Sequence, residues 1–222
     1  MSMMIVRDER GFTLAELMVA TLITTLVLGG AVMMTSQVQK SFVRQIEDSA
    51  GEQEGRYALE WVSRLIRAAG NNPFSLTSVG GATPECPIAG TPYSWVVMDP
   101  DGDTFNDDIR LQADSNPPDG ILGGVGCDQA FEDVTVSYDP LTKSVTFLDN
   151  NIGGAATVRT DAVIEDLLFV YRDSQRAITA NPANVTYVET QITVRTRRID
   201  PATGLPETRL LTQEVRLRGR NF

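Results

Sequence analysis

The residues best suited to chemistry lie in a short acidic stretch at residues 99–108, DPDGDTFNDD. Its carboxylates belong to Asp99, Asp101, Asp103, Asp107 and Asp108. Alternating carboxylates of this kind can supply the six to eight oxygen ligands that Ca²⁺ accepts in loose geometry. The stretch departs from an EF-hand, because its glycine is at the fourth place and Arg110 stands where the bidentate glutamate would be. Two interpretations stay open: a structural calcium site, and a solvated acidic turn before a strand.

The sequence contains no recognisable pattern of a catalytic nucleophile with a general base. The chain has no histidine, which is the commonest general base and neutral metal ligand. A glycine-rich segment at residues 120–126 lacks the Lys-Ser/Thr ending of a phosphate-binding loop, and no strong strand leads into it. No GxSxG elbow surrounds any serine. The sequence therefore predicts a protein that is not an enzyme and that requires no cofactor other than the calcium considered above.

The only cysteines, Cys86 and Cys127, lie far apart and form no CxxC pattern. In an exported protein, an even pair within a loop-rich region predicts a disulfide. Two free buried thiols are the alternative. The disulfide prediction thus depends on export, which the N-terminus indicates.

The strongest signal is at the N-terminus, where a short charged stretch precedes a long apolar one. Residues 12–34, FTLAELMVATLITTLVLGGAVMM, contain a single ionisable side chain, that of Glu16. They are long enough to cross a bilayer as a helix. A secretory signal peptide would instead have a shorter apolar core followed by a small-residue cleavage site. Cleavage after Gly11 would leave the apolar segment on the mature protein as an anchor.

Glu16 needs a physical explanation, because a carboxylate within a membrane span is costly and usually has a partner. If the chain is cut after Gly11, the new amine belongs to Phe12. On a helix this amine lies about one turn from Glu16, on the same side. A neighbouring subunit, staggered along the axis, could pair its Phe12 amine with this carboxylate. The alternative is a carboxylate that only reaches the membrane interface.

The stretch GFTLAELMV, residues 11–19, resembles the prepilin processing motif of type IV pilins and type II secretion pseudopilins. The resemblance implies that a prepilin peptidase cuts after Gly11 and N-methylates Phe12. It also implies that Glu16 guides assembly with other major and minor pilins at an inner-membrane platform. Ala15 departs mildly from the motif, since many relatives have isoleucine there. The implied location is the bacterial inner membrane, with one span in the lipid bilayer and the head in the periplasm, and then a pilus on the cell surface.

The elements that must position these residues begin with one long helix. Apolar residues recur at steps of three or four beyond the apolar segment and predict that the helix continues to Ala69, a length of about 87 Å. The predicted stripe is Val38, Phe42, Ile46, Ala50, Gln53, Tyr57, Trp61, Leu65 and Ala69. Gly70 and Pro73 then predict its end. The glycines at Gly29-Gly30 and at Gly51 and Gly55 indicate either close packing or places where the helix can unwind.

A β-rich head is predicted to follow. Candidate strands are residues 93–98, 108–113, 134–138, 144–148, 163–172, 187–197 and 208–218. An antiparallel sheet on the second half of the helix would bury both apolar faces, which is the α+β type IV pilin fold. The predicted parts are a leader at 1–11, a transmembrane or filament-core half-helix at 12–34, an amphipathic half-helix at 35–70 and a periplasmic head at 71–222.

The net charge of −10 disfavours a nucleic-acid partner. Residues 71–189 hold 18 acidic and 5 basic side chains, whereas residues 190–222 hold 7 arginines and 3 acids. The acidic and basic segments either form solvated faces of opposite charge or help neighbouring subunits to dock.

The end of the helix, with Arg56, Arg64 and residues 65–70, and the closing strand at 210–218 are similar to PilW-like minor pilins. The predicted function is therefore that of a minor pilin in pilus initiation or at the tip. The alternatives are a J-type minor pseudopilin of type II secretion and a calcium-dependent adhesive or ligand-binding head.

Overall fold

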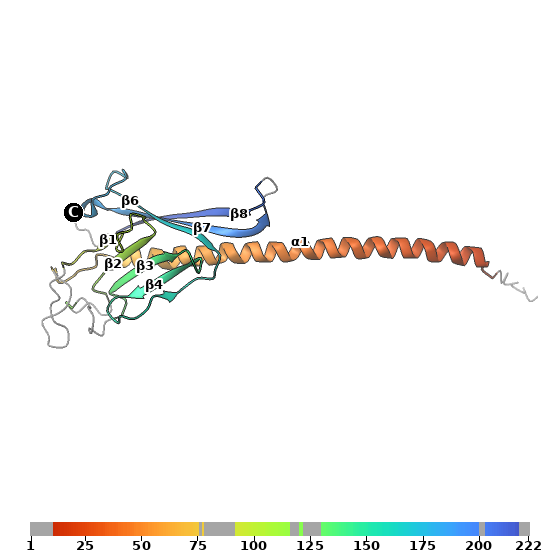
Figure 1. The fold of residues 1–222 in the computed structure, drawn as a ribbon, viewed down its shortest axis with the longest axis horizontal. Helices are drawn as coiled ribbons and strands as arrows, with labels where there is room; N and C mark the ends of the chain where they lie inside the picture. The colour runs from red at the N-terminus through yellow and green to blue at the C-terminus, as the bar shows by residue number, and fades with distance from the viewer. Residues whose placement is uncertain are drawn as a thin grey trace, which may run out of the picture. The chain divides into compact units, whose positions relative to one another are not determined.

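The computed structural model describes residues 11–75, 77, 92–115, 120–121, 130–199 and 203–217. The chain forms two compact units, Met1–Ile46 and Glu47–Phe222, which we call the N-terminal unit and the head unit. Helix α1 (Leu14–Ala68) contributes residues to both, and all described strands belong to the head unit. The predicted α+β class is confirmed: a long N-terminal apolar helix is combined with antiparallel sheets (Figure 1).

Helix α1 ends where the sequence predicts. Gly70 has a φ of 80°, a left-handed conformation that favours glycine. Its N–H donates to the carbonyl of Gln112 at 2.9 Å, and the N–H of Asn71 donates to the carbonyl of Ala68 at 3.1 Å. The stop signal therefore also fastens the end of the helix to strand β2.

The head unit contains two antiparallel sheets instead of the single sheet that we expected. The first has the order β1 (Val96–Met98), β2 (Asp108–Gln112), β3 (Asp133–Asp139), β4 (Ser144–Asp149) and β5 (Thr157–Val158). The second has the order β6 (Ile164–Arg172), β7 (Tyr187–Ile199) and β8 (Pro206–Arg216), with a short 3₁₀ helix η1 (Pro182–Asn184) between β6 and β7. Alternation along a strand indicates which side chains face a core but not which strands pair, so the break between β5 and β6 was not visible in the sequence.

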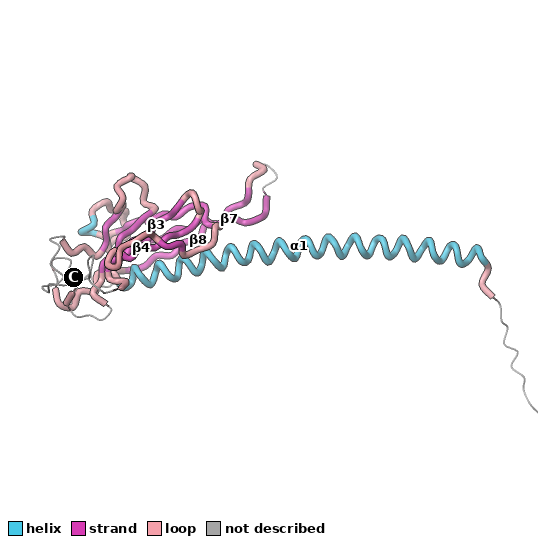
Figure 2. Tube along the Cα trace, turned by 60° about the horizontal axis from the view of Figure 1, so that its bottom comes forward, coloured by secondary structure: helices cyan, strands magenta, loops and turns pink. Residues whose placement is uncertain are grey.

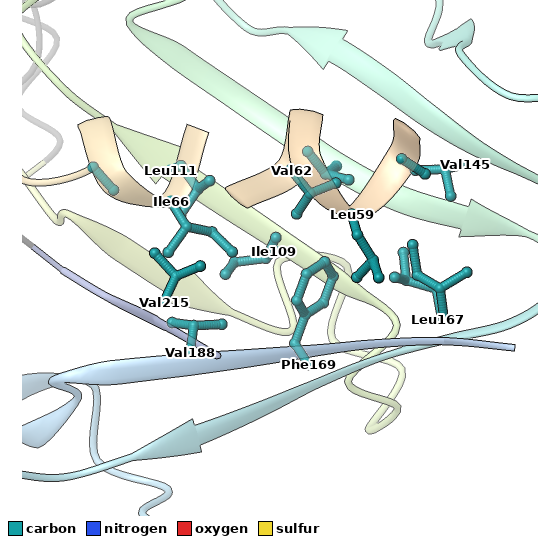
Figure 3. Packing of buried hydrophobic residues seen from close by; sticks show 14 of the residues in the cluster. Leu59, Val62, Ile66, Ile109, Leu111, Val145, Leu167, Phe169, Val188 and Val215 are labelled. Atoms are coloured by element: carbon teal, nitrogen blue, oxygen red, sulfur yellow. The ribbon is translucent and has the colours of Figure 1, made fainter. Parts of the chain in front are cut away.

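Both sheets bury their apolar faces against the last turns of α1 in one core. Leu59, Val62 and Ile66 of α1 meet side chains from both sheets, as Figure 3 shows and as the strands around the helix in Figure 2 indicate. The labelled partners are Ile109, Leu111, Val145, Leu167, Phe169, Val188 and Val215. This core holds the strands that carry the acidic loop.

The predicted helix stripe is only partly the buried face. Ala69 is buried, and Trp61 and Leu65 pack against the core, partly buried. Tyr57 is 56% exposed and Gln53 is also exposed, whereas most of the fully buried positions of α1 lie one residue away. They are Gly51, Gly55, Ala58, Leu59, Val62, Ser63 and Ile66. The stripe was assigned by large side chains, but the sheets approach the helix where side chains are small.

Gly51 and Gly55 allow this close approach. A Cβ added at Gly55 would lie 2.5 Å from Cγ1 of Val194 and 2.7 Å from Cδ1 of Leu211, and one at Gly51 would lie 3.3 Å from the carbonyl oxygen of Arg195. Both glycines lie inside α1, which is continuous through them. Of the two interpretations of these glycines, the structure supports close packing.

Candidate functional site: the N-terminal segment and the acidic loop

Gly11 and Phe12 lie in non-helical backbone directly before α1. Both are exposed, Phe12 to 90%, and a Cβ added at Gly11 would meet no atom within 4 Å. Exposed, non-helical backbone is where proteolysis concentrates. The peptide bond after Gly11 therefore lies in exposed, non-helical backbone, and cleavage there remains a prediction. The preceding leader residues 1–10 lie outside the described residues.

Glu16 forms a capping box with Thr13 at the start of α1. The N–H and the hydroxyl of Thr13 both donate to Oε2 of Glu16 at 2.9 Å, and the N–H of Glu16 donates to Oγ1 of Thr13 at 3.3 Å. The carbonyl of Thr13 accepts the N–H of Leu17, the first hydrogen bond of the helix. In the described part of the chain these bonds leave Oε1 of Glu16 without a partner. We missed this local role, although the Thr-x-x-Glu signal is present in the sequence.

The first half of α1, as far as Met34, exposes a largely apolar surface. Every large apolar side chain between Phe12 and Ile46 is more than half exposed. By length and composition, the helix could cross a membrane. Burial would stabilise each large side chain by roughly 1.5–3 kcal/mol, so this surface requires lipid or neighbouring helices to cover it.

The hydroxyl groups on the same segment are satisfied within the helix. Those of Thr21, Thr24, Thr25 and Thr35 donate to backbone carbonyls three or four residues earlier, at 2.7–2.9 Å. Such bonds remove the cost of placing a hydroxyl in an apolar medium. Glu16 is the single ionisable residue of the apolar stretch 12–34, and its Oε1 has no protein partner among the described residues.

The acidic loop connects β1 to β2, and the structure brings three of its five aspartates together. Asp99, Asp101 and Asp108 each offer a carboxylate oxygen, and these oxygens lie within 4.8 Å of one another. Asp103 and Asp107 are not part of this group. Asp99 lies at a φ of 47°, and its carboxylate accepts the N–H groups of Gly102 and Thr104 at 2.9 and 3.0 Å. The loop thus holds these three carboxylates close together.

Asp108 is the buried member of the group, with 2% of its surface exposed. Its Oδ2 accepts the N–H of Asp101 at 3.3 Å, whereas its Oδ1 is buried without a hydrogen-bond partner. Burial, followed by the charge of Asp101, raises the pKa of Asp108 to about 7. Burial also raises the pKa of Asp107, with a further contribution from Asp103. The loop therefore brings carboxylates close together, and among the described residues their partners are backbone N–H groups and not cationic side chains.

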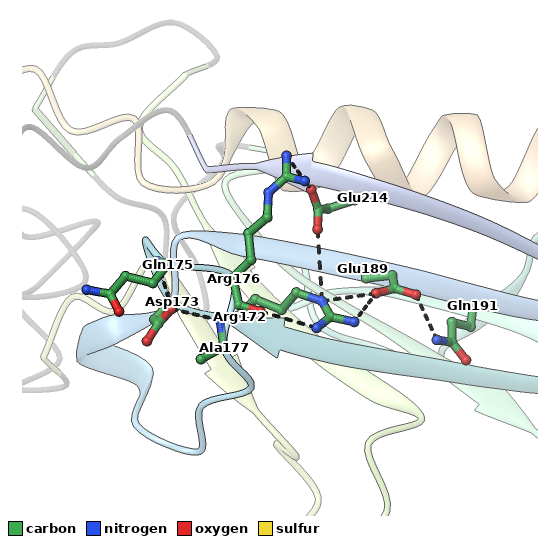
Figure 4. Close-up of polar contacts among 8 residues, drawn as sticks. All are labelled: Arg172, Asp173, Gln175, Arg176, Ala177, Glu189, Gln191 and Glu214. Carbon is green, nitrogen blue, oxygen red and sulfur yellow. Dashed lines mark hydrogen bonds and ion pairs between the residues drawn. The ribbon is translucent and has the colours of Figure 1, made fainter.

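The C-terminal arginines are partly used within the head unit. Arg209 pairs with Glu52 of α1 at 2.5 Å, and Arg195 lies 3.5 Å from Glu165. Figure 4 shows a further network across the second sheet, in which Arg172 pairs with Glu189 at 2.6 Å and Arg176 with Glu214 at 3.3 Å. These pairs connect α1 with β8, β6 with β7, and the turn after β6 with β8, and the sequence carried no signal for them. Cys86 and Cys127 lie outside the described residues, so the disulfide remains a prediction.

The comparison with protein families identifies the N-terminus. Residues 6–32 match the family model described as the prokaryotic N-terminal methylation motif. No curated protein and no solved structure matches the chain significantly. The matched segment contains Gly11, Phe12, Thr13 and Glu16, which are the residues of the cleavage region and of the capping box.

Proposed function

We propose that this chain, which carries the N-terminus of a type IV pilin or pseudopilin precursor, is a minor pilin of the PilW-like kind, acting in pilus initiation or at the pilus tip. The observation that carries the proposal is the methylation motif at residues 6–32, followed on α1 by large apolar side chains that are all exposed as far as Ile46. Pilins and pseudopilins are structural subunits, so the prediction of a non-enzyme agrees with the match. The head of 152 residues, 71–222, is larger than a minimal pilin head needs, which favours a minor subunit over the bulk one.

In this proposal, prepilin peptidase cuts after Gly11 and methylates Phe12, and the helix then leaves the bilayer for the filament. The apolar contacts with lipid are exchanged for contacts with neighbouring pilin helices, which makes the transfer feasible. Oε1 of Glu16 is available to accept a hydrogen bond from the Phe12 amine of a neighbouring subunit. Because the partner is a cation, this contact would be charge-assisted and favour one stagger between subunits.

The first test is the mass of the N-terminal peptide, measured in sheared surface filaments and in membranes of the same cells. We expect a methylated N-terminus at Phe12 in the sheared fraction. The same mature peptide found only in membranes would favour either a type II secretion pseudopilin or a pilin that only primes assembly. An intact leader in both fractions would refute processing after Gly11, and Gly11→Val should produce that result.

The pairing role of Glu16 can be separated from its capping role. Glu16→Gln retains a capping-box residue but removes the charge, so the variant should be processed normally yet enter filaments at least tenfold less efficiently. Thr13→Val removes the capping hydroxyl but retains the carboxylate, and we expect a smaller defect. Equal incorporation of the wild type and Glu16→Gln would refute charge pairing. If Thr13→Val enters filaments less efficiently than Glu16→Gln, then Glu16 acts mainly by capping the helix.

A further inference from the structure

We propose that the loop between β1 and β2 binds one calcium ion through the carboxylates of Asp99, Asp101 and Asp108. This inference goes beyond the proposed function, since it concerns the head unit and none of the N-terminal residues. Only three of the five aspartates are proposed as ligands. The carboxylate oxygens that lie within 4.8 Å of one another belong to Asp99, Asp101 and Asp108, and Asp103 and Asp107 are not in this group. Three carboxylates can supply up to six oxygens, and Ca²⁺ also accepts waters and backbone carbonyls.

The buried oxygen of Asp108 is the independent observation that points to a ligand. Only 2% of the surface of Asp108 is exposed, and its Oδ1 accepts no hydrogen bond. A buried acceptor left without a partner is costly, and more so when it is charged. A cation placed between this oxygen and the carboxylates of Asp99 and Asp101 would remove that cost.

The charge around the cluster also calls for a cation. Within the described ranges, no ion pair joins Asp99, Asp101 or Asp108 to an arginine or lysine. Three mutually close carboxylates repel one another, and a divalent ion compensates most of their charge. Oxygen-only ligands and the absence of histidine from the chain favour a hard cation. A loop with uneven carboxylate geometry suits Ca²⁺ better than Mg²⁺, which requires near-octahedral coordination.

The segment between the ligands is anchored on both sheets. The carbonyl of Asn106 accepts the N–H of Phe169 in β6 at 2.7 Å, and the carbonyl of Asp107 accepts the N–H of Tyr138 in β3 at 3.1 Å. The hydroxyl of Tyr171 donates to the carbonyl of Asp108 at 3.4 Å. An ion bound by Asp99 and Asp108 would therefore join the end of β1 to a point where both sheets meet, and would stabilise the head unit.

The test uses the full-length protein in detergent, stripped with EGTA and then titrated with CaCl₂ or MgCl₂ at constant ionic strength. Calorimetry gives the Kd, and tryptophan fluorescence gives the Tm. We expect saturating calcium, about 100-fold above its Kd, to raise the Tm by roughly 5–10 °C. The same concentration of magnesium should raise it by less than half as much.

Two matched variants distinguish calcium binding at a defined site from non-specific attraction to the negative charge of the loop. Asp101→Asn changes an exposed ligand and should raise the Kd for calcium at least tenfold. Asp103→Asn removes the same charge from the same loop outside the cluster, and should change the Kd less than about threefold. The proposal is overturned if the wild type shows no calcium-dependent shift, if magnesium matches calcium, or if the two variants weaken binding equally. Since Asp101 and Asp103 are both exposed, neither variant removes a buried side chain.

Discussion

The contact of α1 with the second sheet at Gly55 provides the sharpest test of the packing. Alanine at this position would place its Cβ 2.5 Å from Cγ1 of Val194 and 2.7 Å from Cδ1 of Leu211. Carbon atoms in favourable contact lie about 3.5–4.0 Å apart, so the space is short by about 1 Å or more. Val194 cannot move aside easily, because it is 1% exposed and β-branched.

Two opposing effects decide the stability of Gly55→Ala. Alanine gains about 1 kcal/mol over glycine in a helix interior. Overpacking a tight core costs about 1–3 kcal/mol, and the two short distances place Gly55 at the upper end of that range. We therefore expect a net destabilisation of about 2 kcal/mol. Helix propensity alone predicts the opposite sign.

The assay is urea unfolding of the full-length protein in detergent, followed by tryptophan fluorescence. Both tryptophans report on the head unit, and Trp61 packs edge-on against Phe147 with ring centroids 5.5 Å apart. Gly51→Ala is the matched control, one helical turn away. Its Cβ would lie 3.3 Å from the carbonyl oxygen of Arg195, so its free energy of unfolding should stay within about 1 kcal/mol of the wild type.

A second variant links the effect to the clash itself. Val194→Ala removes Cγ1, so adding Gly55→Ala to it should cost less than adding Gly55→Ala to the wild type. If Gly55→Ala is as stable as Gly51→Ala, the close approach of sheet and helix at this position is wrong. The alternative interpretation, a glycine placed for helix unwinding, would then regain support.

Two further predictions concern the head unit. Ile66→Ala should reduce the free energy of unfolding by about 2–5 kcal/mol because the side chain is fully buried, whereas Tyr57→Ala should change it by less than about 0.5 kcal/mol; equal losses in urea unfolding would restore the stripe predicted from the sequence. The ion pair with Arg172 lowers the pKa of Glu189 from its ordinary 4.5, so the pair stabilises the fold above that pH and its contribution is lost as the pH falls through the lowered pKa. Glu189→Gln should therefore be less stable than the wild type at pH 7 and converge with it in acid, and a constant difference in Tm across pH 2–7 would contradict this assignment.

Much of the fold followed from local patterns. The helix end at Gly70, the hairpin around residues 139–143 and the seven predicted strands correspond to elements of the structure, with boundaries that differ by a few residues. Among the strands in the described part of the chain, the two-residue strand β5 was missed, since so short a segment has no periodicity. These features depend on backbone conformation and side-chain alternation, which neighbouring residues in the sequence determine.

The sequence by itself determined the character of the N-terminal segment. Its apolar length, its single carboxylate and the residues around Gly11 are all local features, and the family match covers the same segment. Tertiary structure alone decided which face of α1 is buried, how the strands divide into two sheets, and which aspartates meet. Asp108 follows Asp99 by nine residues, yet the two come together because the intervening loop is held by β3 and β6. Pairing between distant strands and the burial of one carboxylate depend on what the rest of the chain places nearby, and local spacing carries no record of that.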